Sequence, residues 1–117
     1  MKENKLVDLS MDFSIKMLDF CDAVKGHYAL TNQLERSSTS IGANIHEAQY
    51  AQGTKDFISK FEISLKEVYE TEYWLELLFE TGYMDEQTYK PIRNNCGVIR
   101  RMLISSIKTI KENNVDK

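Results

Sequence analysis

Four segments of this chain repeat apolar residues every three or four positions, which is the spacing of one face of an α-helix. The predicted helices cover residues 4–25, 29–50, 55–81 and 85–112. Only a few residues separate them, and no segment alternates with the two-residue period of a strand. Amphipathic helices joined by short connections pack antiparallel. The sequence therefore predicts an all-α fold, an antiparallel up-down-up-down four-helix bundle in a single domain over residues 1–117.

The boundaries of these helices are marked by residues with known end preferences. Gly26 and Gly82 accept the left-handed backbone conformation that ends helices. Thr54 and Asp85 carry side chains that cap helix N-termini. Pro91 lies too deep for the first turn of a helix capped by Asp85. Either that helix kinks at Pro91, which we favour, or a separate turn precedes a helix that begins there.

The composition is that of a compact helical protein in a reducing compartment. The chain has 117 residues with one proline and five glycines. Cys21 and Cys96 stand alone among apolar residues, so we expect reduced thiols in the core. The polar N-terminus lacks the apolar segment of a secretory signal, and no stretch approaches the length of a membrane span. These features predict a cytoplasmic protein with no membrane partner.

The sequence shows no arrangement typical of catalysis or of a metal or cofactor site. A di-iron bundle needs inward-facing Glu-x-x-His pairs, but Val24 stands three residues before His27 and Ala43 three before His46. Zinc-ligand spacing, a nucleophile elbow and a glycine-rich phosphate loop are also missing from the sequence. We therefore expect a protein that is not an enzyme and needs no cofactor.

The segment 34–48 of the second predicted helix carries a polar stripe beside its apolar face. The stripe consists of Arg36, Ser40, Asn44 and Glu47. A face that is merely covered by solvent more often carries long Lys and Glu side chains, which favour the helix better than Ser or Asn. The small residues in this segment predict that other helices come close, and the polar stripe predicts specific hydrogen bonds.

One carboxylate, Glu72, interrupts the apolar seam of the third predicted helix. A buried carboxylate needs a partner or must take up a proton. We expect Arg36 to be its charge partner, with Ser40 and Asn44 as hydrogen-bond donors and Glu70 as a second candidate partner for Arg36. This cluster would fix the register of the two helices; a ligand-binding or catalytic role and an oligomer contact are the alternatives. Replacing Arg36 with alanine is then expected to destabilise the fold or its assembly.

Charge is distributed unevenly along the chain, whose net charge is −3. Residues 1–53 sum to −2, residues 54–86 to −6 and residues 87–117 to +5. The basic residues of the fourth predicted helix lie on one face: Arg93, Arg100, Lys108 and Lys111, with Arg101 beside them. This stripe could follow the phosphates of a nucleic acid, pair with the acidic face of the third helix in a neighbouring subunit, or stay solvated. No aromatic residue interleaves it, so stacking on unpaired bases is not supported.

Several spaced motifs resemble those of one protein family. The segment from Arg36 to Glu47 resembles the R-x-x-x-S-I-x-x-N-I-x-E signature of the four-helix-bundle proteins encoded in 23S rRNA intervening sequences. Three further motifs match in the family's order: Lys55–Phe57 as K-[ED]-F at the start of helix three, Glu70 and Glu72 as E-x-E, and Gly82–Tyr83 as G-Y before helix four. The resemblance spans about residues 5–112.

The resemblance implies an α-helical up-down bundle assembled as a ring-like homo-oligomer, with a pentamer as the expected state and no assigned enzymatic activity. The family is similar to the accessory protein of diversity-generating retroelements, a pentameric bundle whose basic surface binds nucleic acid and a reverse transcriptase. The signature positions carried over to this chain are Arg36, Ser40, Asn44, Glu47, Glu70 and Glu72. The Lys and Arg residues of helix four would form the candidate nucleic-acid surface.

Two hypotheses about function follow from these features. In the first, the chain is a non-enzymatic, homo-oligomeric scaffold that assembles with copies of itself and with a protein partner. In the alternative, it is an accessory protein that binds nucleic acid, or an enzyme acting on nucleic acid, through the basic surface of helix four.

Overall fold

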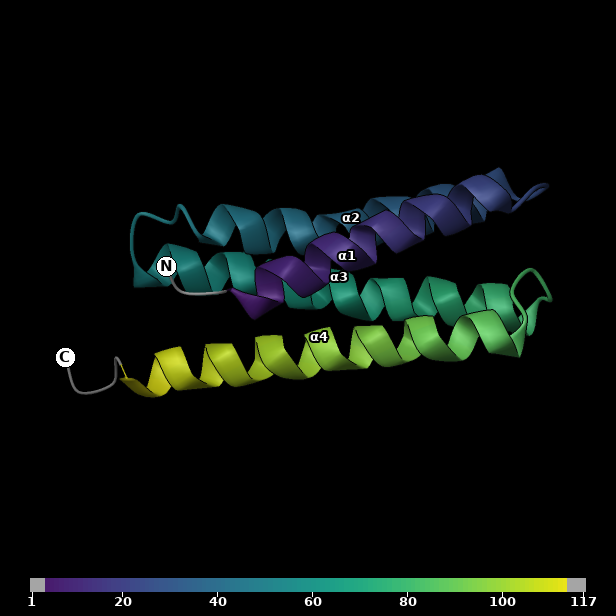
Figure 1. Cartoon of the computed structure of the whole chain (residues 1–117). Coiled ribbons are helices and arrows are strands. Elements are labelled where there is room, and N and C mark those ends of the chain that lie inside the picture. Colours follow the sequence, from purple (N-terminus) through teal and green to yellow (C-terminus); the bar gives the residue numbers. More distant parts are fainter. Residues whose placement is uncertain (1–3, 114–117) are drawn as a thin grey trace.

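The computed structural model describes residues 4–113. Its helices are α1 (Lys5–Ala23), α2 (Tyr28–Ala48), α3 (Thr54–Glu80) and α4 (Glu86–Asn113), each ending within two residues of its predicted range. Successive helices run in opposite directions: the α1–α2 and α3–α4 connections lie at one end of the molecule and the α2–α3 connection at the other (Figure 1). The described residues include no strand. The predicted all-α, antiparallel four-helix bundle is therefore confirmed.

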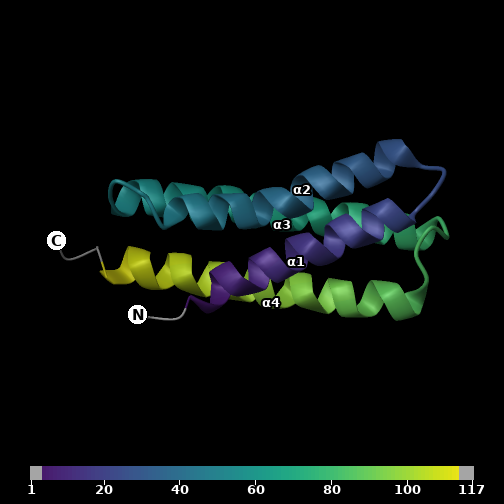
Figure 2. The ribbon, with the colours of Figure 1, turned by 45° about the horizontal axis from the view of Figure 1, so that its top comes forward.

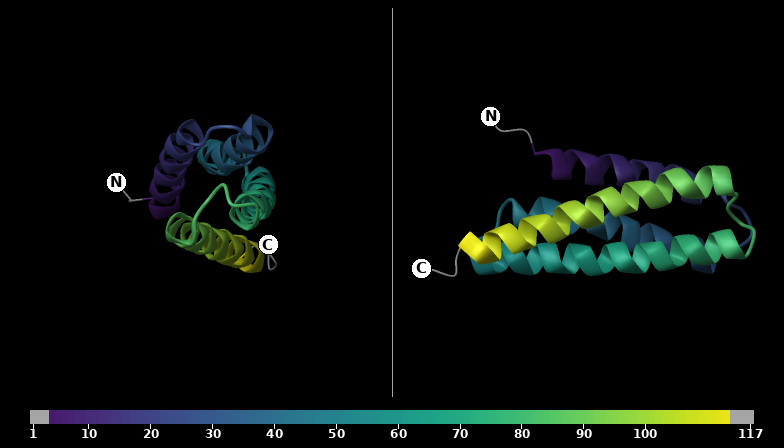
Figure 3. Two further views of the ribbon diagram at one scale, coloured as in Figure 1. Left: turned by 90° about the vertical axis from the view of Figure 1, so that its right-hand side faces the viewer. Right: turned by 90° about the horizontal axis from the view of Figure 1, so that it is seen from below.

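The helices follow one another around the bundle in chain order (Figure 3). α1 packs on α2, α2 on α3 and α3 on α4, while the diagonal pairs α1–α3 and α2–α4 make no close backbone approach within the described chain. α1 runs at a slant to α4 and meets it over a much smaller area than the other neighbours share (Figure 2). The bundle is thus a tightly packed series of three helix pairs that is loosely closed between α1 and α4.

All four helices contribute apolar side chains to one core, as their three- and four-residue spacing predicts. Burial of each such side chain stabilises the fold by about 1.5–3 kcal/mol. The largest apolar side chains that are fully or almost fully buried are Phe13, Met17, Leu34, Ile41, Ile45, Val68, Leu75, Leu78, Ile99 and Leu103.

Side chains cap the first and last helices. The Asn4 side chain accepts a hydrogen bond from the backbone N–H of Val7 at 3.1 Å. Asp85 Oδ1 accepts one from the N–H of Thr88 at 2.8 Å, which confirms its predicted capping role. Hydrogen bonds from the Thr88 side chain and backbone lower the pKa of Asp85. The predicted N-cap at Thr54 is wrong: Thr54 is already helical, and the residue at the N-cap is Gly53, which has no side chain to offer.

The predicted stop at Gly82 is a hydrogen-bonded turn. Gly82 has a φ of +84°, a left-handed conformation in which a β-carbon is strained. The N–H of Tyr83 bonds to the carbonyl of Leu78 at 2.9 Å, and the N–H of Gly82 to that of Phe79 at 3.1 Å. These two bonds form a Schellman motif, which satisfies carbonyl groups that the end of α3 leaves free.

Pro91 lies inside α4 rather than at its start. The helix already makes the Tyr89 N–H to Asp85 carbonyl bond at 2.9 Å, one turn before the proline. α4 is therefore a single helix capped by Asp85. The alternative of a separate turn followed by a helix beginning at Pro91 is excluded.

The small residues of α2 allow α1 to come close, as the sequence predicted. A β-carbon placed on Gly42 would lie 3.2 Å from Ser14 Oγ and 3.3 Å from the backbone carbonyl oxygen of Ser10. Because one of these neighbours is backbone, a larger residue at position 42 requires α1 itself to move.

We expect Gly42→Val to destabilise the bundle by about 1–3 kcal/mol, the usual cost of overpacking a closely packed contact, even though valine favours helix slightly more than glycine does. Urea unfolding followed by circular dichroism measures this. Gly53→Ser is the control, since nothing lies within 4 Å of a β-carbon there and serine caps helices well. Equal stability of the two variants would show that α1 and α2 are not in tight contact.

Candidate functional site

Arg36 projects from α2 toward α3 and joins a surface network. Its guanidinium donates to the carboxylate of Glu70 and lies 3.5 Å from a carboxylate oxygen of Glu67. Gln33 Oε1 accepts two further bonds from it at 3.2 Å, and Trp74 Nε1 donates to the same Glu70 oxygen at 2.9 Å. Half of the Arg36 side chain stays exposed, at 50%. The pairing of Arg36 with Glu70 is present, but it is not buried.

The other members of the predicted stripe do not reach Glu72. Ser40 Oγ donates to the carbonyl of Arg36 at 2.7 Å, and Asn44 Nδ2 donates to the carbonyl of Ser40 at 2.9 Å. Both bonds stay within α2. Glu47 pairs with Lys60 of α3 at 3.2 Å. The expected role of Ser40 and Asn44 as donors to a buried carboxylate is therefore wrong.

The buried hydrogen bonds between α2 and α3 come from hydroxyl groups that the sequence analysis had not singled out. Thr71 Oγ1 donates to Ser37 Oγ at 2.9 Å, and Ser64 Oγ donates to the carbonyl of Ile41 at 2.9 Å. Ser37, Ser64 and Thr71 are fully buried. The available signal was their position, because they lie at core spacing where Leu or Ile would normally stand.

Glu72 is buried, as predicted, with 8% of its surface exposed. Its partners come from α4 and not from α2: Arg93 Nη1 donates to Glu72 Oε2, and Arg100 Nε lies 3.3 Å from the same oxygen. The expected Arg36–Glu72 pair is wrong for a geometric reason. Glu70 and Glu72 stand two positions apart, about 200° around the helix, so one faces α2 and the other α4.

Arg93 is fixed from two sides. Burial tends to lower the pKa of its guanidinium, but a hydrogen bond with Tyr89 and the charge of Glu72 outweigh burial and raise the pKa overall. Tyr89 in turn stacks on Phe79 of α3, with ring centroids 4.3 Å apart and an interplanar angle of 5°. The junction of α3 and α4 thus combines a carboxylate, a guanidinium and two stacked rings.

The basic stripe of α4 is largely engaged within the chain. Besides Arg93 and Arg100, Lys111 pairs with Glu62 of α3 at 3.2 Å. Arg101 and Lys108 form no ion pair with a carboxylate in residues 4–113. Pairing with the acidic face of α3 therefore occurs inside one molecule, and a continuous free stripe of five cations is not present.

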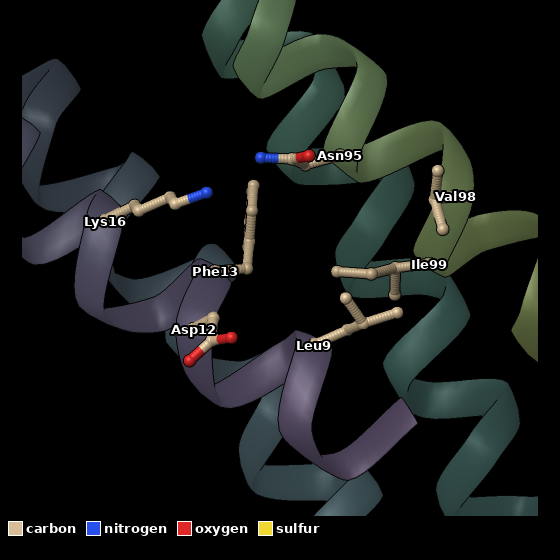
Figure 4. Close-up of a pocket in the computed structure, with 7 residues that line it drawn as sticks. All are labelled: Leu9, Asp12, Phe13, Lys16, Asn95, Val98 and Ile99. Carbon is tan, nitrogen blue, oxygen red and sulfur yellow. The ribbon is translucent and has the colours of Figure 1, made fainter. Parts of the chain in front are cut away.

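A cavity of about 160 Å³ lies where α1 and α4 are loosely packed. Figure 4 shows Phe13 and Ile99 pointing between the two helices, with Lys16 and Asn95 approaching each other above them. Leu9, Asp12 and Val98 complete the lining. The walls are mostly apolar, with Asp12 and Lys16 as the charged side chains of the lining, and the cavity follows from the slanted course of α1.

Exposed apolar side chains on α1 lie beside a groove between α1 and α2. Met11, Ile15 and Leu18 lie on one face of α1 and are exposed by 56%, 51% and 41%. Beside them is a groove of about 280 Å³ between the helices. Its lining contains no Asp, Glu, Lys or Arg and consists of Val7, Ser10, Met11, Ser14, Thr39, Gly42, Ala43 and His46. We call these exposed residues and this groove the α1/α2 face.

Cys21 and Cys96 are reduced core residues, as the sequence predicted. Both cysteines are free and buried. Burial raises the pKa of Cys21 to about 11 and that of Cys96 to about 12, with nearby carboxylates adding to each shift.

No group of three or more His, Cys, Asp or Glu residues able to hold a metal ion occurs in the described part of the chain. Nor is any helix in residues 4–113 both long and apolar enough to cross a membrane.

Comparison with known proteins identifies the family. The family model described as 23S rRNA-intervening sequence protein matches residues 2–105. The chain belongs to this family. A solved structure of a protein with unknown function from the S23 ribosomal protein family of Bacteroides thetaiotaomicron is 43% identical, with a TM-score of 0.84 over 88% of this chain and 98% of that one. No curated protein matches the chain.

Membership of the 23S rRNA-intervening sequence protein family confirms the resemblance seen in the motifs. The signature positions form two separate sets in the bundle. Arg36 with Glu70, and Glu47 with Lys60, join α2 to α3, whereas Glu72 joins α3 to α4. The signature therefore marks contacts along both sides of α3 and not a single site.

We expect Glu72→Gln to lower the free energy of unfolding by about 1–2 kcal/mol, because two partly buried arginines lose their counter-charge. Arg36→Ala is expected to cost less than about 1 kcal/mol, since its ion pairs are exposed to water. The sequence predicted that Arg36→Ala destabilises the fold or its assembly by leaving a buried carboxylate unpaired, but Glu72 is paired by α4 instead. Denaturant unfolding of both variants in parallel measures the two losses, and a larger loss from Arg36→Ala would contradict the arrangement of α3 described here.

Thiol chemistry should follow the burial of the cysteines. At pH 8 the folded chain is expected to react with a disulfide reagent at least about tenfold more slowly than the urea-unfolded chain, because both raised pKa values leave the thiols protonated. Raised thiol pKa values favour the folded state below pH 9, and this contribution is lost as pH rises above it. Reagent kinetics followed by absorbance measure the rates; equal rates in the two states would contradict burial.

Proposed function

We propose that this chain is a non-enzymatic scaffold that assembles with copies of itself through the α1/α2 face. The observation that carries the proposal is the exposure of Met11, Ile15 and Leu18 together on one helix face. A soluble monomer seldom leaves three large apolar side chains of one helix face in water, and such patches are typical of protein interfaces. The adjoining groove offers a place for them that is free of charged side chains.

The shape of the face favours a second copy as the occupant. Protruding apolar side chains lie beside a groove on the same molecule, and Met11, which also lines the groove, belongs to both. If the protruding residues of one copy enter the groove of the next and not the reverse, the contact is head-to-tail, and such a contact makes a ring where the rotation between copies closes. The ring-like homo-oligomer that the family resemblance implies, with a pentamer as the expected state, is part of the proposal.

The serine, histidine and cysteine side chains of the bundle support a role in binding and not in catalysis. The hydroxyls of Ser37, Ser38 and Ser40 bond to backbone carbonyls of α2. His27 lies edge-on to Tyr83 at 5.0 Å, and His46 packs against Tyr50 at 5.4 Å. Two buried thiols with no disulfide between them suit the reducing cytoplasm, where we place the protein.

Light scattering coupled to size-exclusion chromatography tests the assembly. We expect the wild-type chain at micromolar concentration to have several times the 13.6 kDa mass of one copy, with five copies as the favoured number. Ile15→Glu should shift it to the monomer, because a carboxylate cannot be buried in an apolar interface without a partner.

Ile63→Glu is the matched control, since Ile63 is 42% exposed on α3, away from the α1/α2 face. This variant should keep the wild-type mass. A monomeric wild-type chain, or dissociation by Ile63→Glu but not by Ile15→Glu, would overturn the proposal.

A further inference from the structure

Gly97 lies in the middle of α4, directly beneath two guanidinium groups. A β-carbon at Gly97 would lie 3.1 Å from Arg101 Nη1 and 3.6 Å from Arg100 Nη2. Gly97 is itself buried, although Arg101 beside it is exposed. Glycine inside a helix costs about 1 kcal/mol relative to alanine. At this position its missing side chain provides the room in which the two arginines fold back over the helix.

Arg100 is also linked to Arg93, because both contact the carboxylate of Glu72. Arg93 and Arg100 both contact Glu72 Oε2, while Arg100 and Arg101 both lie over Gly97. Two guanidinium groups thus contact one carboxylate, and a third lies beside one of them over Gly97. Arg101 has no carboxylate partner within the described part of the chain. Like charges held this close repel one another, and a bound anion relieves that repulsion.

We propose that Arg93, Arg100 and Arg101 form a phosphate-binding site centred on Gly97. Guanidinium groups present planar pairs of N–H donors that match phosphate oxygens. Glu72 neutralises one of the three positive charges and fixes two of the guanidinium groups, so the site keeps an excess of two. That excess is close to the charge of a phosphate monoester near neutral pH, about −1.5 to −2, whereas each phosphodiester of a nucleic-acid backbone carries a single negative charge.

This site differs from a diffuse basic stripe in that it depends on the shape of the helix surface as well as on charge. It lies along the α3/α4 side of the bundle, across from the α1/α2 face in the order of helices around the axis (Figure 3). It therefore goes beyond the proposed assembly and does not compete with it. The phosphate group could belong to a nucleic-acid backbone or to a small phosphate compound, and the two sources can be separated by experiment.

Isothermal titration calorimetry of the full chain with pyrophosphate, at about 50 mM salt, tests the site. Gly97→Ala keeps every charge and favours the helix, but its β-carbon would lie 3.1 Å from Arg101 Nη1, so the guanidinium must shift slightly. We expect Arg101→Gln to weaken binding about tenfold or more, and Gly97→Ala to weaken it less, by about threefold, because the shifted guanidinium keeps its charge. Lys108→Gln removes one positive charge from the same helix outside the cluster and should change binding less than about twofold. Circular dichroism of each variant checks that the bundle is intact.

A second titration with a ten-nucleotide single-stranded RNA identifies the source of the phosphate. RNA binding that Gly97→Ala weakens in parallel with pyrophosphate assigns the site to a nucleic-acid backbone. Pyrophosphate binding without RNA binding assigns it to a small phosphate compound. Absence of pyrophosphate binding at millimolar concentration would overturn the proposal. So would equal losses for Arg101→Gln and Lys108→Gln with no effect of Gly97→Ala, because binding would then follow charge alone.

Discussion

The carboxylate of Glu72 is the point on which the attachment of α4 depends. α4 packs extensively on α3 alone, since its contact with α1 is small and it makes no close approach to α2 in the described residues. At the centre of that single interface Glu72 is buried between Arg93 and Arg100. An ion pair is costly to desolvate, but once buried it penalises any register that leaves one partner alone. Apolar packing holds α4 near α3, and the ion pairs of Glu72 favour the register in which Arg93 and Arg100 both reach the carboxylate.

The α2–α3 interface is fixed by a different kind of interaction. There the buried polar contacts are neutral: Thr71 bonds to Ser37, and Ser64 to the carbonyl of Ile41. Small hydroxyl side chains let the helix backbones approach and still satisfy their own polar groups. The charged pairs of this interface remain at the surface, where water weakens them. Close packing therefore sets the α2–α3 distance, whereas charge sets the α3–α4 register.

Features that belong to a single helix could be predicted from the sequence, whereas contacts between helices could not. Apolar spacing is a property of each helix by itself, so the four helices and the burial of Glu72 could be read from the sequence. The partner of Glu72 could not, because it depends on which face of α3 meets α2 and which meets α4. Glu70 and Glu72 are adjacent in the motif yet face different helices. The cluster over Gly97 is also a tertiary feature, since a glycine in a helix does not reveal which side chains cover it.

The two sides of the bundle have opposite chemical character, and this has a consequence for any assembly. The α1/α2 face is apolar and its groove carries no charged side chain, whereas the α3/α4 side carries Glu72, Arg93, Arg100 and Arg101. Copies joined through the first side would each leave the second exposed, so a ring would present the arginine cluster once per copy. A ligand with many phosphates can then engage several clusters at once, and its affinity gains from effective concentration. A single small phosphate compound occupies one cluster and gains nothing from assembly. The effect of assembly on affinity therefore distinguishes a polymeric ligand from a small one, even where the contacts within each cluster are the same.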